Sequence, residues 1–203
     1  MNNRAIILAS LILVFAIGTN FIMEQNDESL AVPEALNNDP DLYMLNATIT
    51  QFNDQGKIQH EISADRFTHF PLTDVTALIQ PKMRLFPAAE DAPWDIVAKN
   101  GRLLPQSDYR EQVVELWDDV LAIQQHADGK FINIQTQSLT VYPGREYAET
   151  NKKVYIDDHT GRTTAAAMKA YFETGKFIFY STPTERVQTI FLPEFSSRSK
   201  DDP

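Results

Sequence analysis

From Leu42 onward, apolar and polar residues alternate with a period of two. In segment 57–65 one face is apolar apart from a histidine, and the other face carries Lys, Gln, Glu, Ser and Asp. Successive side chains of a strand point to opposite faces, so this alternation predicts a half-buried antiparallel strand. The same pattern recurs in segments 94–99 and 132–136, and helical spacing fits these segments poorly.

Other short runs rich in apolar and β-branched residues also predict strands, separated by Gly, Pro, Asn and Asp. The turn signals are Asn53–Gly56, Pro87, Pro93, Asn100–Gly101, Asp128–Gly129, Pro143–Gly144, Gly161 and Gly175. The predicted strands are Leu42–Phe52, Val75–Gln80, Lys82–Phe86, Val113–Trp117, Val120–Gln124, Leu139–Tyr142, Lys153–Ile156, Thr163–Phe172, Phe177–Tyr180 and Val187–Leu192.

A weak internal repeat accompanies the alternation. Ile62, Ile96 and Ile134 each open a similar four-residue pattern, at spacings of 34 and 38 residues. A unit that cannot bury its own apolar face must stack on its neighbours. The pattern therefore predicts an all-β domain, two twisted antiparallel sheets folded toward each other as a jelly roll or an open V.

Before the alternating region lies a run without charge, Ala5–Met23. At about 1.5 Å per residue it is long enough to cross the hydrocarbon layer of a membrane. A cleavable signal peptide is the alternative, but the run is longer than the usual signal core and no small-x-small site follows it. Arg4 precedes the run and acidic residues follow it, so residues 1–4 are expected in the cytoplasm and everything after Met23 outside.

The segment 24–41 is acidic and interrupted by Pro33 and Pro40, which predicts a flexible linker. The β domain is expected to cover residues 42–192, and residues 193–203 are expected to form a disordered tail. One domain of this size can bury a real core without disulfides, and the chain has no cysteine.

Composition and motifs exclude several functions. A net charge of −10 argues against a nucleic-acid partner. There is no phosphate-binding loop and no nucleophile elbow, and the four histidines lack metal-ligand spacing, so neither a metal nor another cofactor is expected. The pairs Asp118–Asp119 and Asp157–Asp158 are interpreted as turn or strand-end residues. An enzyme, an exported β-sandwich hydrolase, is therefore the least favoured class.

Several landmarks resemble the LptC family of lipopolysaccharide export proteins. They are the linker end Asn37–Pro40, Ile62-x-Ala64, Gln80–Pro81, Pro93–Trp94 followed by Ile96 and Ala98, Leu103, and the strand Leu116–Val120. The resemblance extends over most of the chain. The chain departs from the family pattern at Asp118, where the family usually carries glycine, and after Tyr180.

The resemblance implies a non-enzymatic bridge with the lipopolysaccharide-transport (OstA-like) jelly-roll fold. Such a protein is anchored in the inner membrane by one helix, with its domain in the periplasm. It receives lipopolysaccharide from an ABC transporter complex and passes it to a soluble periplasmic LptA-like protein. The pattern leaves open whether two copies pair as a homodimer.

Two sets of residues would serve this role. The partner edges are predicted at Leu42–Phe52, toward the transporter, and in the C-terminal strands from Thr163 through Val187 to Leu192, toward the soluble carrier. The inward positions of successive strands would line a lipid groove: Ala47, Ile49, Ile62, Ala64, Leu78, Met83, Leu85, Trp94, Ile96, Ala98, Ile134, Leu139 and Val141.

Two alternatives concern these sets and the span. Sequence alone favours an ordinary sandwich core for the groove residues, and only the family resemblance favours a lipid groove. The alternative function is a membrane-anchored scaffold that binds proteins by strand addition and carries no lipid. The span can either pack against transporter helices through small residues such as Ala9, Ala16 and Gly18, or serve as a plain tether.

Overall fold

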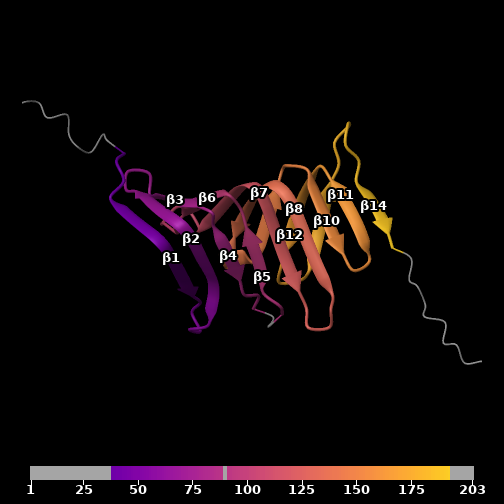
Figure 1. The fold of residues 1–203 in the computed structure, drawn as a ribbon, viewed down its shortest axis with the longest axis horizontal. Helices are drawn as coiled ribbons and strands as arrows, with labels where there is room; N and C mark the ends of the chain where they lie inside the picture. The colour runs from indigo at the N-terminus through magenta and orange to yellow at the C-terminus, as the bar shows by residue number, and fades with distance from the viewer. Residues whose placement is uncertain (1–37, 89–90, 193–203) are drawn as a thin grey trace, which may run out of the picture. The chain divides into compact units, whose positions relative to one another are not determined.

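The computed structural model describes residues 38–88 and 91–192, which form one antiparallel arrangement of fourteen strands and a short 3₁₀ turn (Figure 1). The prediction of an all-β antiparallel fold is confirmed. The elements are β1 (Leu42–Phe52), β2 (Ile58–Phe70), β3 (Val75–Ile79), β4 (Lys82–Leu85), β5 (Trp94–Val97), β6 (Asn100–Leu104), β7 (Val113–Gln125), β8 (Phe131–Tyr142), η2 (Pro143–Arg145), β9 (Tyr147–Thr150), β10 (Val154–Asp158), β11 (Gly161–Ala165), β12 (Ala167–Tyr171), β13 (Lys176–Tyr180) and β14 (Gln188–Phe191).

The sheet is folded into two layers by its long strands. The first half of β2 pairs with β4 and its second half pairs with β3. In the same way β7 pairs with β6 and then β5, and β8 pairs with β10 and then β9. We call β3, β6, β9, β12 and β13 the first layer, and β4, β5, β10, β11 and β14 the second layer. The strands β1, β2, β7 and β8 belong to both layers.

The long strands change layers at a row of bends, which we call the seam. Asn46 on β1 and Asp118 and Asp119 on β7 have positive φ angles, of 49°, 64° and 57°. The pairing of β7 with β8 shifts by one residue there, which is a β-bulge. Between β3 and β4 the chain crosses the seam at Gln80, with φ 52°. Left-handed residues and a bulge therefore produce the fold between the layers.

Polar contacts hold the seam together. The Asp118 carboxylate accepts hydrogen bonds from Asn100 Nδ2 at 2.9 Å and from Gln137 Nε2 at 3.4 Å. The Lys99 backbone N–H donates to the Asp118 carbonyl, and its ammonium lies 2.5 Å from the Asp119 carboxylate. Asp118 and Asp119 are thus mid-strand bend residues, and their interpretation as turn or strand-end residues is corrected. Asp158 does end β10, where it accepts hydrogen bonds from the backbone of Thr160 and Gly161.

The order of pairings in β1–β6 is repeated by β7–β12. In each group the first strand pairs with the second, the second pairs with the third and fourth, the third with the sixth, and the fourth with the fifth. After the second group, β13 pairs with β12 and β14 pairs with β11, as the two halves of β7 pair with β6 and β5 after the first group. Ile62 and Ile134 occupy equivalent positions, whereas Ile96 lies on β5. The true repeat is therefore a six-strand unit, twice as long as the sequence pattern suggested.

Some predicted elements differ from the structure. The strands β6 and β9 were not predicted, and Asn100–Gly101, expected as a turn, begins β6. The predicted strand Thr163–Phe172 is divided at Ala166, where the chain crosses the seam. The predicted membrane span, the linker before residue 38 and the predicted tail lie outside the described residues. Within the described part of the chain, no helix has the length and apolar character needed to traverse a bilayer.

Candidate functional site

The interior between the layers is lined by the inward face of every long strand. Eleven of the thirteen predicted groove residues are buried, none more than 7% exposed: Ile62, Ala64, Leu78, Met83, Leu85, Trp94, Ile96, Ala98, Ile134, Leu139 and Val141. Ala47 and Ile49 on β1 are half-buried and pack against them. All thirteen residues therefore belong to one apolar cluster shared by the two layers.

The interior also contains residues that the sequence analysis did not include. Phe67, Leu116, Ala122, Met168 and Phe172 are buried in the same cluster. Extending the alternation along β7 would have identified Leu116 and Ala122. Met168 and Phe172 belong to a segment predicted as one uninterrupted strand, so the seam crossing at Ala166 concealed their direction.

Aromatic side chains connect the layers. The Trp94 ring on β5 lies 4.7 Å, centroid to centroid, from the ring of Phe172, which follows β12. It also lies 6.3 Å from Phe177 on β13, and Phe177 is stacked at 6.4 Å on Phe179. These rings extend the apolar cluster from the second layer to the C-terminal strands of the first.

Two side chains in the apolar interior have unpaired nitrogen atoms. Both ring nitrogens of His60 and the indole nitrogen of Trp94 are buried without a hydrogen-bond partner among the described residues. Burial lowers the pKa of His60 to about 4, so its imidazole is neutral near pH 7. Unpaired buried polar groups cost free energy, and a bound molecule with hydroxyl or carbonyl oxygens could pair them.

The side opposite the seam, where the strands of both layers end, we call the mouth. A hydrogen bond crosses it from the backbone N–H of Ala88, after β4, to Glu146 Oε1 at 2.8 Å. A cavity of about 570 Å³ lies at the mouth between the β1–β2 turn, the β6–β7 loop and η2. Its lining includes Phe52, Gln59, Glu111 and Arg145. We call it the mouth cavity.

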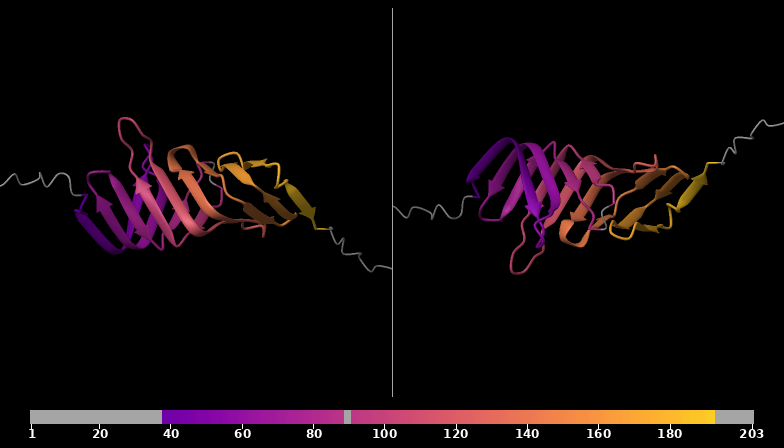
Figure 2. Two further views of the ribbon diagram at one scale, coloured as in Figure 1. Left: turned by 90° about the horizontal axis from the view of Figure 1, so that it is seen from above. Right: turned by 90° about the horizontal axis from the view of Figure 1, so that it is seen from below.

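Both ends of the described domain have free strand edges. Figures 1 and 2 show β1 (indigo) and β14 (yellow) at its opposite ends. Among the described strands β1 pairs with β2 alone, β13 with β12 and β14 with β11. Leu42 and Phe52 lie at the two ends of β1, and Val187 and Leu192 flank β14. All four side chains are exposed. Thr163 lies one strand inside this edge, because its strand β11 is covered by β14.

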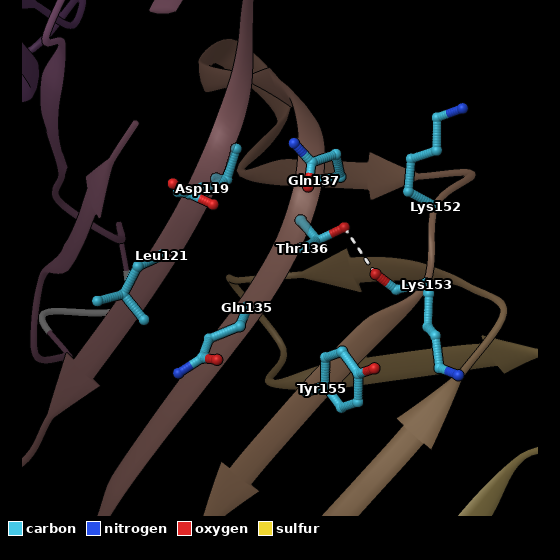
Figure 3. A pocket seen from close by; sticks show the side chains of 9 residues that line it. Asp119, Leu121, Gln135, Thr136, Gln137, Lys152, Lys153 and Tyr155 are labelled. Carbon is cyan, nitrogen blue, oxygen red and sulfur yellow. Dashed lines mark hydrogen bonds between the residues drawn. The ribbon is translucent and has the colours of Figure 1, made fainter. Parts of the chain in front are cut away.

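A cavity of about 590 Å³ opens on the outer face of the second layer (Figure 3). Leu121, Gln135 and Tyr155, from the neighbouring strands β7, β8 and β10, line it. At its seam side Thr136 Oγ1 donates a 3.0 Å hydrogen bond to the Lys153 carbonyl. The Lys153 ammonium lies 5.8 Å from the Tyr155 ring and pairs with Glu185 at 3.4 Å. These polar groups are paired with one another. The residues lining the cavity do not include a nucleophile beside a general base.

The adjacent aspartates of the two Asp–Asp pairs have structural partners. Asp157 forms a two-point ion pair with Arg162, which lowers its pKa. Asp158 caps the β10–β11 turn, and Asp118 holds the seam. In the ranges 38–88 and 91–192, no three His, Asp or Glu side chains lie close enough to bind a metal ion.

Comparison with known proteins provides the family. A family profile described as "Lipopolysaccharide-assembly, LptC-related" matches residues 8–185. The chain belongs to this LptC-related family. The match covers most of the chain and ends before β14, in line with the departure from the family pattern after Tyr180. No curated protein sequence matches the chain.

A likeness to a solved structure is weaker. LptH of Pseudomonas aeruginosa is described as the LptA-homologous periplasmic component of the lipopolysaccharide transport device. It superposes with a TM-score of 0.49 at 7% identity, over 76% of this chain and 96% of that chain. Membership of the LptC-related family gives the chain a role in lipopolysaccharide transport, and members of this family are transport components rather than enzymes.

Proposed function

We propose that this chain receives lipopolysaccharide from an inner-membrane ABC transporter complex between its two layers and passes it to a soluble periplasmic LptA-like protein. The observation that carries the proposal is the shared apolar cluster, which extends from half-buried residues on β1 to Phe177 and Phe179 on β13. Residues 5–23 would anchor the chain in the inner membrane, with the β domain in the periplasm.

The energetics support an interior path for acyl chains. Exposing an acyl chain of about a dozen carbons to water costs on the order of 10 kcal/mol, at roughly 0.8 kcal/mol per CH₂ group. Side chains such as Ile62, Leu78 and Ile96 can replace that water with apolar contacts. Because these residues pack against one another in the structure, an incoming chain has to separate the layers. The Ala88–Glu146 hydrogen bond and the ring contacts of Trp94 join the layers and would have to give way.

The strand edges support two protein partners. An edge strand carries unpaired N–H and C=O groups that accept a strand from another protein. We propose that β1 meets the transporter and that β13 and β14 meet the soluble carrier. The edge residues Leu45, Phe52, Ile190 and Phe191 are exposed apolar side chains, and such residues favour association.

Site-specific photo-crosslinking in living cells tests the interior path. A photoreactive amino acid at Ile96, which points inward, should form adducts with lipopolysaccharide. The neighbouring Val97 on the same strand points outward and is 36% exposed, so the same substitution there should form none. Ile62 and Trp94 provide further inward positions, and exposed Lys57 provides a second control.

The alternative function is a membrane-anchored scaffold that binds proteins by strand addition and carries no lipid. The closely packed interior is the observation that favours it. If the inward variants fold, reach the membrane and capture both protein partners but form no lipid adduct, the scaffold is the correct function.

A further inference from the structure

The outer face of the first layer carries a trough beside the mouth. A cavity of about 460 Å³ is lined by Arg145, Tyr147, Glu149, Lys169 and Tyr171. A neighbouring cavity of about 360 Å³ also includes Glu149 and Lys169 and continues toward the seam. We call the two together the outer trough. Arg145 also lines the mouth cavity, so the trough and the mouth cavity share this residue.

A row of three tyrosines lies at the mouth end of the trough, and two of them, Tyr147 and Tyr171, line it. Tyr142, Tyr147 and Tyr171 are register neighbours on β8, β9 and β12. Their ring centroids are 5.5 Å and 5.1 Å apart. The Arg145 guanidinium lies 4.5 Å from the Tyr142 ring centroid, and the ring of Tyr171 is the most exposed of the three. The row presents aromatic surface together with hydroxyl groups.

Hydrogen-bonding groups of both kinds line the rest of the trough. Glu149 accepts hydrogen bonds from the hydroxyls of Tyr147 at 2.6 Å and Tyr142 at 3.4 Å. Burial and this carboxylate raise the pKa of Tyr147, so its hydroxyl stays protonated. Toward the seam the lining adds the hydroxyls of Ser138 and Thr140 and further polar side chains.

The charges of the trough are balanced. Lys169 lies 3.9 Å from Glu149, and Arg145 lies 2.7 Å from Glu111. A polyanion would meet the Glu149 carboxylate, and an extended apolar chain would meet the charged groups of Arg145, Glu149 and Lys169. Sugar residues combine apolar C–H faces with hydroxyls that both donate and accept, which matches tyrosine rings beside mixed donors and acceptors.

The fold itself does not require these residues. In the first six-strand unit, the positions equivalent to Tyr142, Tyr147 and Tyr171 are occupied by Phe70, Val75 and Leu104, and Ala77 stands in the place of Glu149. The same backbone pairing is thus made without a hydroxyl or a carboxylate there. The presence of the three tyrosines and Glu149 is therefore not explained by the folding of the six-strand unit alone.

We infer that the outer trough binds the sugar portion of the transported amphiphile while its acyl chains lie between the layers. This inference rests on the proposed function. The sugars are covalently joined to the acyl chains, so they must leave the interior beside its opening and stay in water. The trough meets the mouth cavity at Arg145 and provides an aromatic and hydrogen-bonding surface for the sugars.

Titration of the full-length chain in detergent with a lipid-free, neutral oligosaccharide released from lipopolysaccharide tests the inference. Binding is read by saturation-transfer NMR and calorimetry. The Tyr171→Ala and Lys169→Ala variants should each weaken binding at least fivefold. Tyr155→Ala is the matched control, because Tyr155 is similarly exposed on the outer face of the second layer with a lysine beside its ring, and it should bind unchanged.

Each outcome separates this inference from the proposed function. Absence of oligosaccharide binding, or equal binding by the Tyr171→Ala variant, overturns the trough even if Ile96 still forms lipid adducts. Tighter binding of a polyphosphate or of a peptide than of the oligosaccharide also overturns it. Oligosaccharide binding that depends on Tyr171, in a chain that forms no lipid adducts, supports the trough as a sugar site and rejects the interior path.

Discussion

At the residue scale, Asp118 shows how the seam tolerates a side chain where the resemblance to the LptC family predicts glycine. Its φ of 64° is a left-handed value that glycine adopts freely. Aspartate is among the residues that enter this region most readily, and its carboxylate is held by Asn100 and Gln137. The departure from the family pattern at Asp118 therefore keeps the bend and adds two hydrogen bonds to it.

The cost of the left-handed backbone at Asp118 can be measured by comparing two substitutions. Asp118→Ala and Asp118→Gly both lose the carboxylate, but only alanine must hold its Cβ in the left-handed region. We expect the alanine variant to be less stable by about 1 kcal/mol in urea unfolding. At Ser138, on the neighbouring strand, the order should reverse, since glycine weakens an ordinary strand. Equal stability of the two Asp118 variants would contradict a strained bend.

The buried environment of His60 leads to a prediction about how stability depends on pH. Its pKa falls to about 4 in the folded state from about 6.5 when unfolded. As the pH falls from about 6.5 to about 4, the unfolded imidazole takes up a proton that the folded one does not. The free energy of unfolding should therefore decrease in this range, by at most about 1.4 kcal/mol per pH unit.

Replacing His60 with leucine should remove this pH dependence. His60→Leu also eliminates two unpaired buried nitrogens, so the variant should be about 1–3 kcal/mol more stable than the unmodified chain at pH 7. Urea unfolding at pH 7 and pH 5.5 measures both effects. His159→Gln, in an exposed turn, should leave them unchanged. A His60→Leu chain that loses as much stability at pH 5.5 as the unmodified chain would contradict the assignment.

Single residues also limit what the alternation could predict. Inward positions such as Ile62, Leu85 and Ile96 were predicted because apolar and polar residues alternate without interruption around them. The trough residues Tyr142, Tyr147 and Tyr171 gave no such signal. Tyr142 and Tyr147 lie on either side of η2, and Tyr171 joins them only through the pairing of β9 with β12, which a local pattern does not contain.

At the element scale, the position of β14 depends on a glycine in β11. A Cβ placed on Gly161 would lie 2.0 Å from the Ile190 carbonyl oxygen and 3.0 Å from the Phe191 Cα. Both neighbours are backbone atoms, so a side chain cannot be accommodated by a rotamer change. The close approach of β11 and β14 therefore requires glycine at this position.

Gly161→Ala should consequently separate β14 from the sheet. We expect faster hydrogen exchange of the amides of Gln188–Phe191, while β10 and the interior stay protected. Gly144→Ala, where the added Cβ meets nothing within 4 Å, is the control. If β14 receives the soluble carrier, the Gly161→Ala chain should also capture that partner less well. Unchanged exchange in β14 would show that the strand tolerates the displacement.

Short elements were the ones that sequence reasoning missed. The strands β6 and β9 are five and four residues long, and both lie next to a seam crossing or a turn. In β6, Asn100 and Gly101 have the composition of a turn, yet pairing with β3 and β7 makes them a strand. Tertiary pairing overrode local propensity there.

At the scale of the whole described domain, the alternation predicted the all-β fold class and the inward and outward faces of the strands. It did not predict how the chain passes from one layer to the other. A continuous sheet whose long strands belong to both layers places the same residues inward as two separate sheets would. The difference lies in Asn46, Gln80, Asp118 and Asp119, whose left-handed backbone is visible in the structure and not in the alternation. The six-strand repeat was likewise concealed, since Ile96 resembles Ile62 in pattern but not in position.

The repeat means that the molecule is modular. After six strands the chain returns to the same layer, running in the same direction, so a whole unit could be duplicated or excised without altering either terminal edge. Inserting or removing only one or two strands would instead place the following strands in the opposite layer. It would also reverse the direction of the strand at one terminal edge. Natural or engineered variants of this architecture should therefore differ in length by complete six-strand units.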